Sequence, residues 1–419
     1  MEAIETATRA GLHRAGAAAL TAMLRERGDH AAAVACTCGG QARYHDQRSK
    51  RLLTVLGPVE LERAYYVCPR CHESLIPRDR ELDVEKHEFS PGVRRMMALV
   101  GSEASFDGGR EQLDLLAGLE VTAKAVERQA EAIGADIAAR EQEQIRRAKQ
   151  LEFPEVCAPT VPVLYIEMDG TGIPVVKAET EGRSGKVEGV PAHTREVKLG
   201  CVFTQTGLDE EGRPVRDEES TSYVAAIETA EDFGLRIYTE AWRRGWSRAK
   251  KKVVIGDGAV WIWNLADQHF PGAIQIVDLY HARQHLWDLS AKLFPADEQT
   301  RKRWTACRLK QLEAGKIEAL VKSLGELGSQ GPELAKLASN EAEYFERNKE
   351  RMRYPWFRAQ GLFVGSGVVE AGCKEVIGSR LKRSGMFWSV QGANAIIALR
   401  CCRLSGSFAD YWESRSGAA

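Results

Sequence analysis

The chain has 419 residues and a formal net charge of −1 at pH 7, and 44% of its residues are hydrophobic. This length favours two to four domains with apolar cores. No apolar run reaches the length of about eighteen residues that a membrane span needs, and the N-terminus lacks the basic start and apolar stretch of a secretory signal. The sequence therefore predicts a cytoplasmic protein without a membrane partner. The near-zero charge alone argues against a nucleic-acid partner, although Lys and Arg residues are clustered locally.

Two close pairs of cysteines near the N-terminus predict a structural zinc site. They flank a β-patterned stretch that turns near Gly57-Pro58, as in a zinc ribbon, where two knuckles supply four thiolates to one Zn²⁺. The predicted ligands are Cys36, Cys38, Cys68 and Cys71. The first pair departs from the commoner C-x-x-C spacing, so His45 and His72 are alternative ligands, and four unligated thiols are the alternative to a zinc site. We assign residues 31–80 to the ribbon and 1–30 to an N-terminal helix.

Residues 88–150 have a helical pattern that starts at Ser90-Pro91. Around Gly118 the pattern resembles a helix-turn-helix, with Thr122 as the cap of the second helix. An ordinary helical hairpin is the alternative. We interpret this region as a candidate DNA-binding region, and the proline-rich stretch after it as the boundary to the next domain.

The next part of the chain has the element order strand, strand, strand, helix, strand, helix, strand. The predicted strands cover 161–176, 198–204, 221–227, 252–258 and 273–281, and the predicted helices cover 228–246 and 259–270. This is the order of the ribonuclease H-like fold. The sequence therefore predicts an α/β (α+β) protein, with a ribonuclease H-like mixed sheet whose first part is residues 160–282.

Three acidic residues stand at the edges of apolar runs and are the candidate catalytic residues. Asp169 and Asp257 each end a predicted strand and precede a glycine, and Glu370 lies in a late helical run. Carboxylates at the rim of a sheet suit a hard cation and a phosphate, as divalent-metal phosphoryl transfer requires. The alternative is that the Asp-Gly pairs are ordinary turns.

The segments around Asp169 and Asp257 also superficially resemble haloacid dehalogenase-type phosphatases. The attacking carboxylate of such an enzyme would be at Glu167, whose extra methylene would misplace the oxygen, and the last Asp of the second motif is replaced by Trp261. These two substitutions argue against a phosphatase.

After the core strands the chain becomes charged and helical. Residues 283–355 form a predicted all-helical insertion, and the core resumes over 360–410 with a C-terminal helix. A basic stretch with aromatic neighbours follows Glu370, and such stretches can neutralise phosphates and stack on bases. The candidate DNA-binding residues are Arg380, Lys382, Arg383 and Trp388. A solvated charged face, with Trp388 in the core, is the alternative.

In combination, several motifs make the chain resemble DDE-type insertion-sequence transposases, closest to the ISKra family. The motifs are "CTCGG", "CPRC", "EMDGTGIPV", "REVKLG", "VIGDGAVWIWNLA", "VDLYHARQHL", the Gly-Ser-Gly before Glu370 and "RLKRSGMFWSVQGANAIIALR". The resemblance covers nearly the whole chain and implies a catalytic triad of Asp169, Asp257 and Glu370. Asp278 and His281 are similar to the D-x-x-H element of some transposases and are candidate accessory residues.

The resemblance implies a transposase that cleaves and joins DNA at insertion-sequence ends by two-metal-ion phosphoryl transfer. Two Mg²⁺ ions, or Mn²⁺, would be held by the three acids, and one structural Zn²⁺ by the four cysteines. The implied partners are terminal inverted repeats, target DNA and further copies of the chain on DNA, in the bacterial cytoplasm and at the nucleoid when bound. The alternatives are a domesticated DNA-binding protein that does not cleave, and a ribonuclease H-like nuclease that does not join strands.

Overall fold

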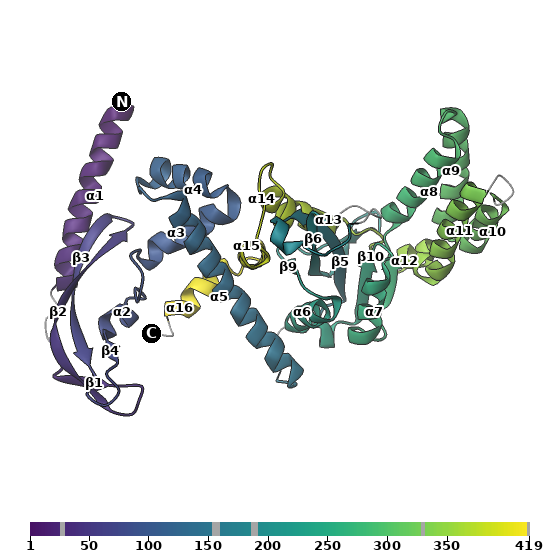
Figure 1. The fold of residues 1–419 in the computed structure, drawn as a ribbon. Coiled ribbons are helices and arrows are strands. Elements are labelled where there is room, and N and C mark those ends of the chain that lie inside the picture. Colours follow the sequence, from purple (N-terminus) through teal and green to yellow (C-terminus); the bar gives the residue numbers. More distant parts are fainter. Residues whose placement is uncertain (26–29, 153–159, 186–191, 328–331, 417–419) are drawn as a thin grey trace. The chain divides into compact units, whose positions relative to one another are not determined.

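The computed structural model describes residues 1–25, 30–152, 160–185, 192–327 and 332–416, which Figure 1 draws as ribbon. The chain forms two compact units. Residues 1–137 and 407–419 make the first, and residues 138–406 make the second. Cys157 and most of the proline-rich stretch predicted as a boundary lie outside the described residues. None of the helices in the described ranges combines the length and apolar character needed to cross a membrane.

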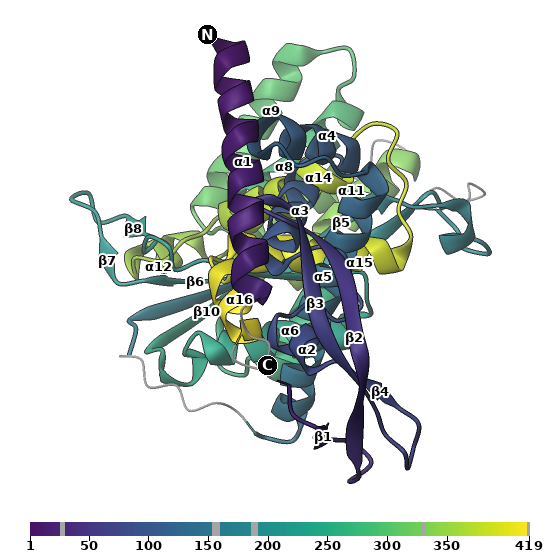
Figure 2. The ribbon, with the colours of Figure 1, turned by 90° about the vertical axis from the view of Figure 1, so that its left-hand side faces the viewer.

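A four-stranded antiparallel sheet in the order β1-β2-β3-β4 forms the N-terminal part of the first unit. Its strands are β1 (Ala33–Ala35), β2 (Gln41–Thr54), β3 (Gly57–Val67) and β4 (Ser74–Leu75). Helix α1 (Glu2–Arg25) lies along the β2–β3 hairpin (Figure 2), where Ala17 packs with Leu52, Val59 and Leu61. The hairpin turns directly before Gly57, whose φ of +105° is in the left-handed region that favours glycine. The turn is therefore at Val55-Leu56, two residues before its predicted position at Gly57-Pro58.

The rest of the first unit is helical. It contains α2 (Pro77–Glu81), α3 (Pro91–Glu103), α4 (Phe106–Gln112), the π-helical turn η1 (Leu113–Ala117), the start of α5 (Ala123–Lys149) and α16 (Phe408–Ser416). Ser90 caps α3 by accepting a hydrogen bond from Val93 N, and Pro91 follows it. Gly118 ends η1 at a φ of +64°, and the Thr122 hydroxyl accepts a hydrogen bond from Ala125 N at the start of α5. The predicted helix start, turn and cap are confirmed.

A five-stranded mixed sheet in the order β11-β10-β5-β6-β9 is the centre of the second unit. Its strands are β5 (Val163–Pro174), β6 (Thr194–Gln205), β9 (Ser222–Ala226), β10 (Lys251–Gly256) and β11 (Ile274–Val277). β5, β10 and β11 are parallel, whereas β6 is antiparallel to both β5 and β9. The predicted mixed sheet is confirmed. The hairpin β7 (Gly207–Leu208) and β8 (Pro214–Val215) and the turn η2 (Lys177–Glu179) are additions to it.

Helices cover both faces of this sheet (Figure 1). Gly200 leaves room for Phe233 and Ile237 of α6 on one face, and its neighbour Leu199 contacts Gly372 of α13 on the other. The first face carries α6 (Ala230–Arg243), η3 (Trp246–Arg248) and α7 (Val260–His269). The second carries α13 (Gly367–Gly372), the π-helical segment η6 (Cys373–Gly378), α14 (Ser379–Leu381) and α15 (Val390–Leu404).

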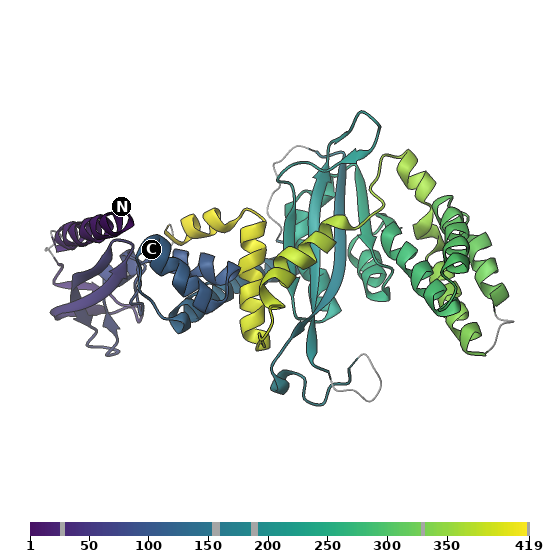
Figure 3. The same cartoon turned by 90° about the horizontal axis from the view of Figure 1, so that it is seen from above.

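The helices of the predicted insertion lie together beyond the β11 edge of the sheet (Figure 3). They are α8 (Leu279–Leu293), α9 (Glu298–Glu313), α10 (Ile317–Gly325), α11 (Pro332–Arg347), η5 (Lys349–Met352) and α12 (Tyr354–Ala359). The strand predicted over 273–281 is wrong at its end, because Asp278 caps α8 by accepting a hydrogen bond from His281 N. The helix therefore begins at Leu279.

Candidate active site and metal centre

Asp169 and Asp257 lie at the level of the sheet where β10 ends. Asp257 directly follows β10, but Asp169 is inside β5, where it pairs with Leu199 of β6, so the prediction that Asp169 ends a strand is wrong. β5 and β10 pair in parallel with Met168 opposite Gly256, and each acid is the next residue along its strand direction. Because parallel strands run in the same direction, both acids lie at the same height in the sheet, level with the carboxyl end of β10. Burial raises the pKa of Asp169, and the negative charge of Asp257 raises it further.

The carboxylate of Asp169 is held from two sides. Its Oδ1 accepts a hydrogen bond of 2.6 Å from Gly170 N, and its Oδ2 accepts one of 3.3 Å from the Cys373 thiol. Both hydrogen bonds oppose the effect of burial on the pKa of Asp169. Cys373 begins the π-helical segment η6, so this contact joins the segment after Glu370 to β5.

Asp257 begins a tight turn that two neighbours fix. Its Oδ1 accepts a hydrogen bond of 2.8 Å from Ala259 N, and its main-chain oxygen accepts one of 2.9 Å from the Tyr344 hydroxyl. Gly258 has a φ of +97°, and a Cβ there would lie 2.6 Å from the Tyr344 ring. Only glycine fits this position without strain.

Glu370 lies in the short helix α13 and its side chain is exposed. The Ser366 hydroxyl lies 3.4 Å from its Oε1. Burial raises the pKa of the Cys373 thiol, and the charges of Asp169 and Glu370 both add to this effect. Cys373 thus contacts Asp169 and lies three residues after Glu370 in the sequence.

The three acids do not form a single ion's coordination shell. Among the described residues, the group of three or more ligand atoms that lie within 4.8 Å of one another is the cysteine group, not Asp169, Asp257 and Glu370. A Mg²⁺ site needs fewer protein ligands than this, because the ion is held by one or two carboxylates together with phosphate oxygens and water. Oδ2 of Asp257 and Oε2 of Glu370 accept no hydrogen bond from the described residues. This all-oxygen set fits a hard divalent cation.

Glu167 is a residue of the site that the sequence analysis missed. It is fully buried, burial raises its pKa to about 8, and its Oε2 accepts a hydrogen bond of 2.8 Å from Val369 N. Its Oε1 has no hydrogen-bonding partner among the described residues. The period of two along a strand places Glu167 on the same face as Asp169, and this signal was present in the sequence.

Asp278, predicted as an accessory residue, has both carboxylate oxygens engaged by main-chain N–H groups. It is fully buried, and its two carboxylate oxygens accept hydrogen bonds from the main-chain N–H groups of His281 and Ser366. His281 is half-buried on the first turn of α8, 5.0 Å from His285 between ring centroids.

Two of the four predicted DNA-binding residues are buried, so the expectation that these two side chains are exposed is wrong. Trp388 is 6% exposed, and its Nε1 donates a hydrogen bond of 3.1 Å to Leu381 O. Arg380 is fully buried, with its guanidinium 5.0 Å from the centre of the Trp388 ring. Neither side chain offers a surface to DNA. Lys382 and Arg383 are exposed, and Lys382 Nζ donates to the Thr171 hydroxyl.

The four predicted zinc ligands converge in the first unit. Sγ of Cys36 lies 3.5 Å from Sγ of Cys71, and Sγ of Cys38 lies 3.6 Å from Sγ of Cys68. All four sulfur atoms lie within 4.8 Å of one another. A tetrahedral zinc site with Zn–S bonds of about 2.3 Å separates its sulfur atoms by about 3.8 Å. A main-chain hydrogen bond from Cys71 lowers the pKa of Cys68 to about 6, whereas burial and hydrogen bonds with the other three sulfur atoms raise the pKa of Cys71 to about 12. This cluster could bind zinc.

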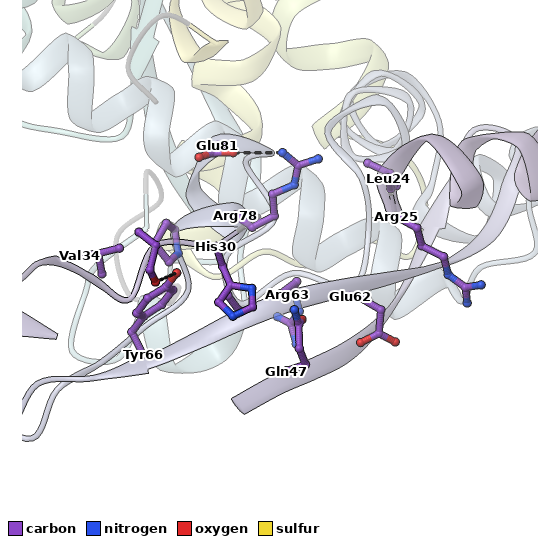
Figure 4. A pocket seen from close by; sticks show the side chains of 13 residues that line it. Leu24, Arg25, His30, Val34, Gln47, Glu62, Arg63, Tyr66, Arg78 and Glu81 are labelled. Carbon is purple, nitrogen blue, oxygen red and sulfur yellow. Dashed lines mark hydrogen bonds and ion pairs between the residues drawn. The ribbon is translucent and has the colours of Figure 1, made fainter. Parts of the chain in front are cut away.

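A separate cavity of about 400 Å³ lies between the end of α1, the β2–β3 hairpin and α2 (Figure 4). Several of the charges around it are paired. Arg78 bonds Glu81 at 3.2 Å, and Arg63 bonds Asp79 at 2.6 Å. Tyr66 donates to Ala31 O. Of the lining residues, Arg63, Arg78, Glu81 and Tyr66 are thus engaged by neighbouring groups, and the predicted catalytic residues lie elsewhere.

Comparisons with known proteins identify a family. A UPF0236 protein of Caldanaerobacter subterraneus subsp. tengcongensis, whose name joins eleven locus designations, is 25% identical over 374 residues, which is 85% of this chain and 68% of that protein. The solved Drosophila P element transposase strand transfer complex aligns over 81% of this chain and 84% of its own, at 10% identity and a TM-score of 0.26. A likeness at this TM-score does not identify a shared fold. The sequence pattern of the uncharacterised protein family UPF0236 matches residues 12–415, and the chain therefore belongs to this family.

Proposed function

We propose that the protein is a DDE-type DNA transposase, with Asp169, Asp257 and Glu370 as its catalytic carboxylates. The observation that carries the proposal is the position of Asp169 and Asp257 after paired residues of two neighbouring parallel strands. Glu370 supplies a third, exposed carboxylate from helix α13, which covers one face of the sheet. Acidic groups of this kind bind the divalent ions of phosphoryl transfer.

The strand arrangement supports a ribonuclease H-like core. Numbered along the chain, the five strands of the sheet lie in the order 5-4-1-2-3, with strand 2 antiparallel to its neighbours and strands 1, 4 and 5 parallel. In such a core the first strand and the end of the fourth supply acids to one edge. Asp169 on β5 and Asp257 after β10 occupy those two positions.

Each residue has a distinct task in the proposed reaction. Asp169 and Asp257 would hold Mg²⁺ or Mn²⁺, and Glu370 would complete the ligand set. The bound ions supply the positive charge that activates water, or a DNA 3′-hydroxyl, and stabilises the leaving oxygen. Cys373 and Gly170 orient Asp169 by hydrogen bonds, and Tyr344 fixes the turn at Asp257. Exposed Lys382 and Arg383 follow Glu370 and would neutralise DNA phosphates.

The partners follow from this reaction. They are the ends of a mobile element, target DNA and further copies of the chain assembled on DNA, with the zinc cluster and the α4–α5 region of the first unit as DNA-binding parts. The name of the Caldanaerobacter relative joins eleven loci, as expected of a gene that multiplies within a genome. This copy number favours the ISKra-like interpretation over a domesticated protein.

The test is cleavage and strand transfer by the purified chain on DNA that carries candidate element ends, with Mg²⁺. Asp169→Asn, Asp257→Asn and Glu370→Gln should each lower cleavage by orders of magnitude while end binding persists. Glu375→Gln, which changes an exposed acid on the adjoining helical segment, is the matched control. Cleavage at the wild-type rate by any of the three variants excludes that residue from the site.

The same assay separates the alternatives. Cleavage without joined products identifies a nuclease that does not transfer strands. End binding without any metal-dependent cleavage identifies a DNA-binding protein that has lost its activity. Either result contradicts the transposase assignment.

A further inference from the structure

Residues 361–370, which we call the Glu370 segment, are fixed to the core through their main chain. At the start of the segment, Gln205 Nε2 donates a hydrogen bond of 2.9 Å to Gly361 O, and Phe363 N donates one of 3.3 Å to the Tyr165 hydroxyl. Leu279 N, at the start of α8, donates one of 2.9 Å to Val364 O. These contacts bring the chain back from the helical insertion across β5 and β6.

Two buried carboxylates hold the rest of the segment. Ser366 N donates a hydrogen bond to Asp278 Oδ2, and Val369 N donates one of 2.8 Å to Glu167 Oε2. Both acids are fully buried, and within the described residues neither forms a salt bridge. The hydrogen bonds to Glu167 and Asp278 thus bracket the last four residues before Glu370.

The same two acids also connect the segment to the other catalytic positions. Glu167 lies two residues before Asp169 on the same face of β5. Asp278 N donates a hydrogen bond of 2.8 Å to Gly256 O, the residue before Asp257. Glu167 therefore links the main chain beside Glu370 to the strand that carries Asp169, and Asp278 links it to the strand end that precedes Asp257.

We propose that Glu167 and Asp278 are positioning residues that set the place of Glu370 relative to Asp169 and Asp257. This inference rests on the proposed function. Neither acid acts as a metal ligand. Both oxygens of Asp278 accept hydrogen bonds from main-chain N–H groups, and Glu167 is fully buried. Burying two acids without cations is costly, and hydrogen bonds to their oxygens offset that cost.

The two acids should respond differently to amide replacement. Glu167 accepts through Oε2, and its Oε1 has no partner among the described residues, so Glu167→Gln can keep the bond to Val369 N. Asp278 accepts through both oxygens, so Asp278→Asn sets an amide NH₂ against a main-chain N–H in either orientation. Glu167→Leu removes the acceptor but fills a similar volume.

The first measurement is hydrogen exchange of peptides that cover 361–372, which needs no activity. Glu167→Leu and Asp278→Asn should each speed exchange in this segment by about 10-fold or more, whereas Glu167→Gln should match the wild type. Thr204→Val is the matched control, because it removes a side-chain hydrogen bond on β6 whose partner is Asp217, outside the segment. Melting temperatures confirm that each variant is folded.

The second measurement is the Mg²⁺ dependence of DNA cleavage. Glu167→Leu and Asp278→Asn should raise the half-saturating Mg²⁺ concentration by about 10-fold, and Glu167→Gln should leave it unchanged. If Glu167→Gln abolishes cleavage as Asp169→Asn does, Glu167 is a ligand and the positioning role is wrong. Unchanged exchange over 361–372 in both Glu167→Leu and Asp278→Asn also overturns it. A wild-type chain that never cleaves DNA contradicts the proposed function, while the exchange result still decides the role of the two acids.

Discussion

The Tyr344 hydroxyl of α11 donates a hydrogen bond of 2.9 Å to the main-chain oxygen of Asp257 at the end of β10. The Tyr344 ring stacks on His285 of α8, with 4.0 Å between centroids and 12° between planes. Nδ1 of His285 lies 2.7 Å from Glu341 Oε2, which also belongs to α11. The helical insertion therefore supports the turn that carries Asp257, the second proposed catalytic acid.

Replacing Tyr344 by Phe should slow the chemical step. The variant keeps the stack on His285 but loses the hydrogen bond to Asp257, so the carboxylate is less well oriented and cleavage should fall about 10-fold at saturating Mg²⁺. DNA binding should not change. Single-turnover cleavage rates and end-binding affinities measure the two effects separately.

Tyr354→Phe is the matched control for this prediction. Tyr354 is also fully buried in the helical insertion, but its hydroxyl has no hydrogen-bonding partner among the described residues. Its loss should leave cleavage unchanged. Equal rates for Tyr344→Phe and wild type would show that the bond to Asp257 does not orient the carboxylate.

The cysteine cluster should carry about one zinc per chain. Double replacement by Cys68→Ser and Cys71→Ser removes two thiolates, so the purified protein should lose its zinc and the ribbon should unfold at a lower temperature. Metal analysis and proteolysis within 31–80 measure both results. Cys307→Ser is the control, since Cys307 is exposed and lies outside the cluster. Retention of one zinc by the double variant would contradict the ligand assignment.

Trp388→Ala should act on stability and not on base recognition. The side chain is buried and bonded to Leu381 O, so its removal leaves a cavity and should cost about 3–5 kcal/mol in the free energy of unfolding. Denaturant unfolding measures this loss. The folded fraction should bind frayed and intact duplex ends with the same ratio of affinities as the wild type, and a selective loss on frayed ends would support stacking.

Lys382→Ala should weaken DNA binding and leave the stability of the fold nearly unchanged. The side chain is exposed and is not part of the core, so stability should change little. Loss of one phosphate contact should weaken binding to all DNA sequences and lower the slope of log affinity against log salt by about one. An unchanged slope would remove Lys382 from the DNA path.

Glu141 should make the stability of the second unit fall as pH rises. Burial raises its pKa to about 7 despite the ion pair of 2.7 Å with Arg236. The folded state therefore keeps a proton that the unfolded state loses at about pH 4.5, and stability is lost as pH rises between these two values, by about 2–3 kcal/mol. Glu141→Gln should remove this loss, as measured by unfolding at pH 5 and pH 8.

Glu143→Gln is the control for this pH effect. The Arg146 side chain lowers the pKa of Glu143 to about 2, so its contribution is present above the unfolded pKa and is constant from pH 5 to pH 8. The difference between wild type and this variant should not change over that range. An equal pH dependence in wild type and Glu141→Gln would show that Glu141 is ionised throughout.

The sequence alone determined the parts of the protein that depend on short-range patterns. Runs of apolar, β-rich residues predicted the strands that became β5 and β10. Asp257 follows the end of β10 as predicted, whereas Asp169 lies inside β5 and not at its end. Ser90 and Thr122 predicted helix starts, because a cap acts within one turn. The two cysteine pairs flank the β2–β3 hairpin, and a hairpin brings its two ends together whatever surrounds it. Their spacing in the sequence therefore predicted that the four sulfur atoms lie close together.

Only the tertiary structure decided the roles that depend on burial. Trp388 and Arg380 follow the pattern of an exposed basic and aromatic stretch, yet both are buried against the second unit's core. Glu167 and Asp278 are acids like Asp169 in the sequence, but one oxygen of each accepts a hydrogen bond from a main-chain N–H more than eighty positions away. Whether a carboxylate faces water, a metal or a peptide N–H is set by segments that pack on it from elsewhere in the chain, and no local pattern contains that information.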